Sequence, residues 1–115
     1  MSPPAIVGTI DLTGAPAREA VDVRVRLEDT TMMDGPSEVI AETLVRLEPD
    51  APMPAPFRLL LPDERLDPRR QYTLTARGRR APGTEFRDCG TVEAFPWKVG
   101  TKTRYRLAMK WFDRN

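Results

Sequence analysis

Three acidic residues in the first third of the chain have the chemistry to hold a hard cation. Glu28, Asp29 and Asp34 lie within seven residues of one another, and carboxylate oxygens are the ligands that calcium and magnesium prefer. However, the segment has no EF-hand pattern, and short polar side chains such as Asp29 and Asp34 also satisfy the backbone donors of a loop between them. Capping of this loop is therefore the favoured interpretation, ahead of a metal site or a paired-carboxylate hydrolase.

The other reactive side chains exclude most classes of enzyme. The chain of 115 residues contains no histidine and one cysteine, Cys89, so histidine-dependent triads, Cys-His pairs and zinc cages are absent. We predict that Cys89 is a small buried apolar side chain. The seven glycines are too dispersed for a phosphate loop, and Ser37 lacks the glycine spacing of a nucleophile elbow. We therefore predict a protein that is not an enzyme and holds no cofactor or metal.

Arginines are concentrated on two predicted strands and in one hairpin region. They are Arg24, Arg26, Arg69, Arg70, Arg77, Arg79, Arg80, Arg87, Arg104 and Arg106. Clustered basic residues can bind a phosphate backbone, but the formal net charge is only +1, and acids such as Asp22, Glu28 and Glu85 are interspersed among them. The pattern predicts a solvated, self-compensating sheet face and no nucleic-acid partner.

Aromatic residues near the C-terminus are candidates for contact with a partner protein. Trp111 is in phase with the apolar row of its strand, so it is predicted to lie in the core. Phe112 is out of phase, and Phe95 and Trp97 lie in a proline-interrupted stretch at a sheet edge. Exposed aromatics provide a large contact area at a low entropic cost. Phe95, Trp97 and Phe112 are therefore the predicted partner-binding residues.

The elements that must position these residues are strands, because apolar and polar residues alternate along most of the chain. The alternation is clearest over Val21–Glu28 and Tyr105–Trp111. Further strands are predicted at Ala5–Leu12, Phe57–Leu61, Tyr72–Arg77 and Phe86–Val92. Ala5–Leu12 is expected to be an edge or first strand, and the last two are expected to form a hairpin across Pro82 and Gly83.

One segment is ambiguous between helix and strand. In Ser37–Leu47, Ile40, Leu44 and Leu47 fit a helical repeat, whereas Val39, Ala41, Thr43 and Val45 fit a strand, and we favour the strand. Asp63–Arg70 is expected to hold a short helical turn. The 12 prolines exclude a long helical bundle. Seven or eight short strands separated by turns predict an all-β chain, with residues 1–115 forming a single antiparallel β-sandwich domain.

No apolar run is long enough to span a membrane, and the N-terminus lacks the features of a signal peptide. We expect a cytoplasmic protein if Met1 is the native start. If a signal peptide has been removed, we expect a periplasmic protein anchored to the outer membrane.

The ordered blocks of the chain resemble the YbaY/YscW family over about residues 6–109. The blocks are Val25–Thr30, Asp34–Ser37, Val39–Glu42, Pro54–Phe57, and Leu66–Pro68 leading into Tyr72–Arg77. Members of this family are small β-sandwich domains of bacterial lipoproteins. One branch resembles pilotins, which are chaperones that help an outer-membrane secretin of type III secretion to assemble.

The resemblance implies a non-enzymatic assembly module that binds a protein segment, such as a secretin tail, by a sheet edge or an apolar groove. An edge strand would also allow a homodimer. The alternative is a carrier of a small apolar ligand, with a lining formed by Met32, Met33, Met53 and Phe57.

Overall fold

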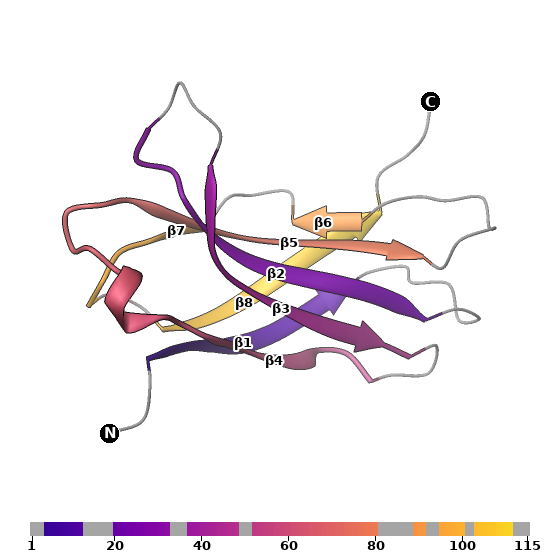
Figure 1. Ribbon diagram of the computed structural model, residues 1–115. Coiled ribbons are helices and arrows are strands. Elements are labelled where there is room, and N and C mark those ends of the chain that lie inside the picture. Colours follow the sequence, from indigo (N-terminus) through magenta and orange to yellow (C-terminus); the bar gives the residue numbers. More distant parts are fainter. Residues whose placement is uncertain are drawn as a thin grey trace.

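The computed structural model describes residues 4–12, 20–32, 37–48, 52–80, 89–91, 95–100 and 103–111. These residues form eight strands and one short 3-10 helix (Figure 1). The strands are β1 (Ala5–Leu12), β2 (Val21–Asp29), β3 (Glu38–Leu47), β4 (Ala55–Leu60), β5 (Tyr72–Arg80), β6 (Cys89–Thr91), β7 (Phe95–Trp97) and β8 (Arg104–Trp111), and the helix is η1 (Asp63–Arg65). No helix in these ranges is long and apolar enough to cross a membrane.

The alternation seen in the sequence separates an inner from an outer face on each long strand. In β2, Val23, Val25 and Leu27 are fully buried, while Asp22 and Arg24 between them are exposed. In β8 the inner row contains Leu107 and Met109, and the outer row is mainly basic. The two faces differ because successive side chains of a strand point to opposite sides of the sheet. The strands predicted from alternation are thus confirmed.

All strands belong to one sheet, which nearly closes into a barrel. Their order is β3-β2-β5-β6-β8-β1-β4, and β7 pairs with β5 beside this path. The end strands, β3 and β4, approach each other and run side by side in Figure 1. The predicted all-β class is confirmed, but the sheet is barrel-like and not clearly a sandwich. Alternation reports which residues face inward and does not report which strands are neighbours.

The pairing of β1 differs from the antiparallel expectation. β1 pairs with β4 in antiparallel and with β8 in parallel orientation, so it lies inside the sheet and not at its edge. At Gly8 the backbones of β1 and β8 come so close that a Cβ atom would lie 1.8 Å from the Tyr105 carbonyl oxygen. A glycine is therefore required at this position.

The core fills the space inside the curved sheet. Its largest fully buried side chains include Tyr72, Leu74 and Leu107. Cys89 is also fully buried, as predicted. A Cβ atom at Gly78 would lie 2.6 Å from the Cys89 sulfur, so the glycine makes room for the thiol.

The remaining predicted elements are confirmed where the structure describes them. Ser37–Leu47 is a strand, β3, with a register shift opposite Leu27 and Glu28. The predicted turn after Pro62 is η1. β6 pairs with β5 as a hairpin partner should, while Pro82 and Gly83, in its predicted turn, lie outside the described residues.

Candidate functional site

The open seam between β3 and β4 is the main interruption of the described sheet. These two strands end the strand order and have no backbone pairing with each other. Several of their Cα atoms nevertheless lie within 8 Å of one another. Two strands that flank a third are about 9–10 Å apart. The seam is therefore too narrow to admit another strand, and a partner would lie over it.

The inward-facing row of β3 is less buried than that of β2. Val45 of β3 pairs with Val23 of β2, and Thr43 pairs with Val25. Directly paired residues point to the same side of a sheet, yet both β2 valines are fully buried while Val45 and Thr43 are partly exposed. The difference arises because β3 has a hydrogen-bonded neighbour on one side only. The interior is thus partly accessible along the seam.

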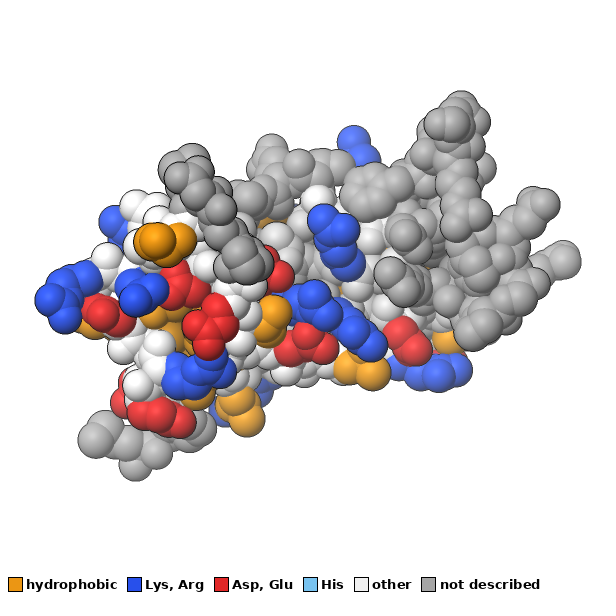
Figure 2. All heavy atoms as spheres, turned by 45° about the horizontal axis from the view of Figure 1, so that its top comes forward, with side chains coloured by type: hydrophobic (Ala, Val, Ile, Leu, Met, Phe, Trp, Pro, Cys, Tyr) orange, Lys and Arg blue, Asp and Glu red, His pale blue; other side chains and the backbone are white. Residues whose placement is uncertain are grey.

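Large apolar side chains on the outer faces of the two seam strands are exposed to solvent. Leu44 of β3 is 60% exposed, Leu60 of β4 is 55% exposed, and Val39 of β3 is 38% exposed. On the face of the molecule in Figure 2, exposed hydrophobic side chains lie as separate patches among charged ones. We call Val39, Leu44 and Leu60 the seam residues.

Sequence reasoning missed the seam residues, although a signal for them was present. Leu60 lies between Leu59 and Leu61 and so occupies an outward position of its strand, where a polar residue is expected. Leu44 likewise lies between Thr43 and Val45, in the outward phase of β3. Apolar residues at positions that alternation reserves for polar ones mark a surface that contacts something other than water.

An ion pair joins the two sides of the seam near the start of β3. Arg65 of η1 donates from Nη2 to the Glu38 carboxylate at the beginning of β3. The ion pair thus limits the opening of the seam at this end of the two strands.

The predicted partner-binding aromatics occupy different environments. Trp97 is only 4% exposed and makes an edge contact with Tyr72, with ring centroids 5.7 Å apart. Its side chain belongs to the buried core cluster. Phe95 is partly exposed and packs edge-on against Tyr105, at 6.1 Å between centroids. Phe112 and the Trp111 side chain lie outside what the structure describes.

The acidic group at the end of β2 includes a capped loop. The Asp29 side chain, 9% exposed, accepts a hydrogen bond from the Thr31 backbone N–H at 3.0 Å and one from Arg70 Nη1 at 2.9 Å. Burial acts to raise the pKa of Asp29, but the hydrogen bonds from Thr31 and the charge of Arg70 outweigh it and hold the pKa below its usual value. This geometry agrees with the loop-capping interpretation of Asp29.

The described residues contain no group of three or more histidine, cysteine, aspartate or glutamate side chains placed to hold a metal ion. Asp34, the third acid of the predicted group, lies outside them.

The methionines of the predicted carrier lining occupy unlike places. Met32 is 72% exposed and Met53 packs against the core. Phe57 borders a pocket that neither of them lines, and Met33 lies outside the described residues.

The positive charges of the arginines on the outer face of β2 are balanced by a carboxylate, as predicted. Arg26 Nε lies 2.6 Å from the Glu42 carboxylate of β3, and Arg24 Nε lies 4.0 Å from the same group. Both pairs are exposed, and they keep this face of the sheet charged but balanced.

One of the comparisons with known proteins shows a family. A family model described as the type III secretion system lipoprotein chaperone YscW matches residues 1–82. No curated protein matches the chain. Among solved structures, the chain is similar in fold to an alternative pilotin from the type II secretion system of Vibrio cholerae, with a TM-score of 0.77 and 17% sequence identity. That match covers 98% of this chain and 100% of the pilotin chain. The YscW match spans well over half of the sequence, and the chain therefore belongs to the YscW family of secretion-system lipoprotein chaperones.

Proposed function

We propose that this protein is a non-enzymatic, pilotin-like chaperone that binds a segment of a secretin through the seam between β3 and β4. The observation that carries the proposal is the family match over residues 1–82. The pilotin-like fold supports it, and the seam provides a surface of the required kind.

The apolar side of an amphipathic segment fits this surface best. Leu44 and Leu60 present exposed aliphatic side chains on adjacent strands, and Val45 offers a partly exposed contact from the interior. A segment that lies over the seam would cover these side chains without separating β3 from β4. The gain comes from the burial of apolar area, at roughly 25 cal/mol per Å².

The test uses a fluorescein-labelled peptide with the C-terminal sequence of a secretin from the host, and fluorescence anisotropy as the measurement. The variants Leu44→Asp and Leu60→Asp each place a charge on the seam. We expect each variant to raise the Kd about tenfold or more, which corresponds to a loss of about 1.4 kcal/mol in binding free energy. Because both side chains are already exposed, the fold should tolerate the changes, and circular dichroism verifies this.

Met32→Asp is the matched control. Met32 is the most exposed of the large apolar side chains that the structure describes, and it lies beyond the end of β2, outside both seam strands. Its substitution should leave the Kd within about twofold of wild type. Equal effects from the control and the two seam variants, or no binding by the wild-type protein, would contradict the proposal.

Phe95 remains a predicted partner contact, and the same titration tests it. Phe95→Ala removes a partly exposed ring while the sheet pairing of β7 with β5 is kept. A Kd higher than that of the wild-type protein, with unchanged thermal stability, would place Phe95 in the interface. Sedimentation velocity, with and without peptide, tests whether the chain also forms a homodimer.

A further inference from the structure

The outer face of β4, β1 and β8 carries an excess of positive charge. It presents four basic residues, Arg58, Arg104, Arg106 and Lys110, and one acidic residue, Asp11, and we call this surface the cationic face. The whole chain has a net charge of only +1. A local excess of three positive charges therefore means that charge is unevenly distributed over the molecule.

Two arginines of the cationic face lack the ion pairs that arginines make elsewhere on the sheet. In the register, Val7 of β1 lies between Arg58 of β4 and Arg104 of β8. Among the residues that the structure describes, neither of these arginines has a carboxylate within salt-bridge distance, and both are exposed. Within the described ranges, Arg106 pairs only with Asp11, at 3.7 Å between Nη2 and Oδ2. On the β2–β3 face, by contrast, all three arginines are paired with carboxylates.

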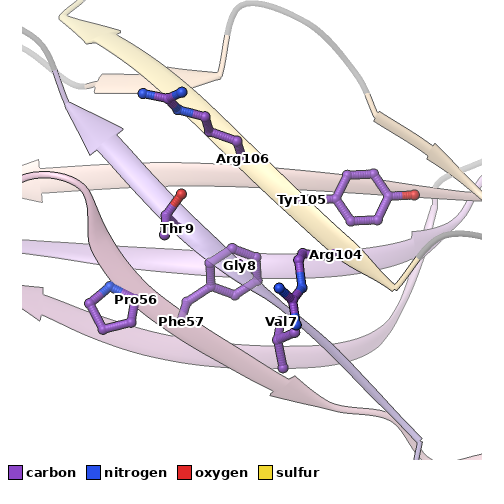
Figure 3. A pocket seen from close by; sticks show the side chains of 8 residues that line it. All are labelled: Val7, Gly8, Thr9, Pro56, Phe57, Arg104, Tyr105 and Arg106. Atoms are coloured by element: carbon purple, nitrogen blue, oxygen red, sulfur yellow. The ribbon is translucent and has the colours of Figure 1, made fainter.

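A pocket of about 540 Å³ lies on the same three strands (Figure 3). It is lined by Val7, Gly8, Thr9, Pro56, Phe57, Arg104, Tyr105 and Arg106. The Arg104 guanidinium lies beside Val7, and the Tyr105 ring points away toward the Pro96 carbonyl oxygen, to which its hydroxyl donates at 3.1 Å. The volume is within the range of ligand pockets. Apolar groups thus form a hollow with guanidinium groups beside it.

We propose that the cationic face binds carboxylate side chains of an acidic, partly apolar segment of a partner protein. Arginine presents a planar fork of donors that matches a carboxylate, and Val7 and Pro56 offer apolar contact between the charges. A recessed hollow fits individual side chains better than it fits the level surface of a membrane. β4 carries both Arg58 of this face and Leu60 of the seam, so one partner segment can reach both surfaces. The inference rests on the proposed function and names the chemistry of the partner.

The test uses a fluorescein-labelled peptide in which glutamate alternates with leucine, and fluorescence anisotropy at low salt. The variants are Arg58→Gln, Arg104→Gln and the double variant. We expect the Kd to rise about fivefold for each single variant and about twentyfold for the double variant. Raising sodium chloride from about 50 mM to about 500 mM should weaken binding to the wild-type protein, because salt screens exposed charges. A peptide with glutamine in place of glutamate should bind much more weakly.

Arg77→Gln is the matched control. Arg77 is exposed on β5, and the structure shows no ion pair for it within the described part of the chain. Its substitution removes the same charge from a strand outside the cationic face and should leave the Kd unchanged. Equal losses for Arg77→Gln and Arg104→Gln would overturn the inference, because they would show that only net charge matters.

Two further outcomes separate this inference from its rivals. Binding of the chain to phosphatidylglycerol vesicles, lost in the double variant, together with no binding of the acidic peptide, would overturn it in favour of a membrane surface. If Leu44→Asp weakens secretin binding while the double arginine variant leaves the Kd of the acidic peptide unchanged, this inference fails and the proposed function stands. If the arginine variants act on the acidic peptide but no secretin segment binds, the proposed function fails instead.

Discussion

Gly8 lies where the backbones of β1 and β8 approach closely, so a single methyl group tests that contact. In Gly8→Ala the new Cβ atom would overlap the Tyr105 carbonyl oxygen, and it would also lie 3.0 Å from the Phe57 ring. Because the main obstacle is backbone, relief requires a strand to shift. We expect the free energy of unfolding to fall by about 3–4 kcal/mol in urea denaturation.

Gly100→Ala is the control for this substitution. Gly100 has a φ of +83°, but no atom lies within 4 Å of the position that a Cβ atom would take there. The change should cost only about 1 kcal/mol, from backbone strain. A Gly8→Ala protein as stable as Gly100→Ala would show that β1 and β8 do not approach as closely as described.

The pair formed by Asp29 and Arg70 should make stability depend on pH in the acid range. The folded-state pKa of Asp29 is lowered by its hydrogen bonds with Thr31 and its pairing with Arg70, against the opposing effect of burial. A lowered carboxyl pKa stabilises the fold at pH values above the unfolded-state pKa of about 3.9. This stabilisation is lost as the pH falls through the folded-state pKa.

Asp29→Asn should therefore reduce the free energy of unfolding by about 1 kcal/mol at pH 7. The difference from wild type should shrink toward pH 3, and urea denaturation across this range measures it. A difference that does not change with pH would mean that the charge of Asp29 is unimportant.

The strands at the seam should exchange their amide hydrogens faster than strands inside the sheet. β3 and β4 each have one paired neighbour among the described strands, whereas β2 and β1 each have two. Amides at a free edge open without disruption of the rest of the sheet. Hydrogen exchange should thus report faster deuterium uptake in residues 38–47 than in residues 21–29. Addition of a binding secretin peptide should slow the exchange of β3 selectively, and uniform slowing would argue against the seam.

β7 is short, and we expect its contribution to stability to come mainly from Trp97. The ring is buried against Tyr72, with an angle of 61° between the planes. Trp97→Ala should reduce the free energy of unfolding by about 3–5 kcal/mol, while Trp97→Phe should cost less because it keeps an aromatic ring. If Trp97→Ala instead leaves stability unchanged and weakens partner binding, the residue belongs to an interface.

The strands and their inner faces were predictable from sequence, because alternation reports burial directly. The pairing of strands was not, since it depends on contacts between distant residues: Gly8 with Tyr105 and Val7 with Arg104 are examples. The seam was missed for the same reason. Leu44 and Leu60 interrupt the alternation in the sequence, but the sequence does not show that β3 and β4 are unpaired neighbours. The predicted contact residue Trp97 was placed at an edge because Pro96 interrupts the alternation there, yet its ring packs inward.

At the scale of the whole molecule, the parallel pairing of β1 with β8 affects how the protein is made. β1 is synthesised well before β8, so a nascent chain that lacks β8 can pair β1 only with β4. Until β8 has been synthesised, the other edge of β1 lacks its partner, and an unpaired strand edge is a template for aggregation. Contacts between residues this distant in sequence also make folding slow. Loss of β8 through a premature stop codon should therefore give an insoluble product.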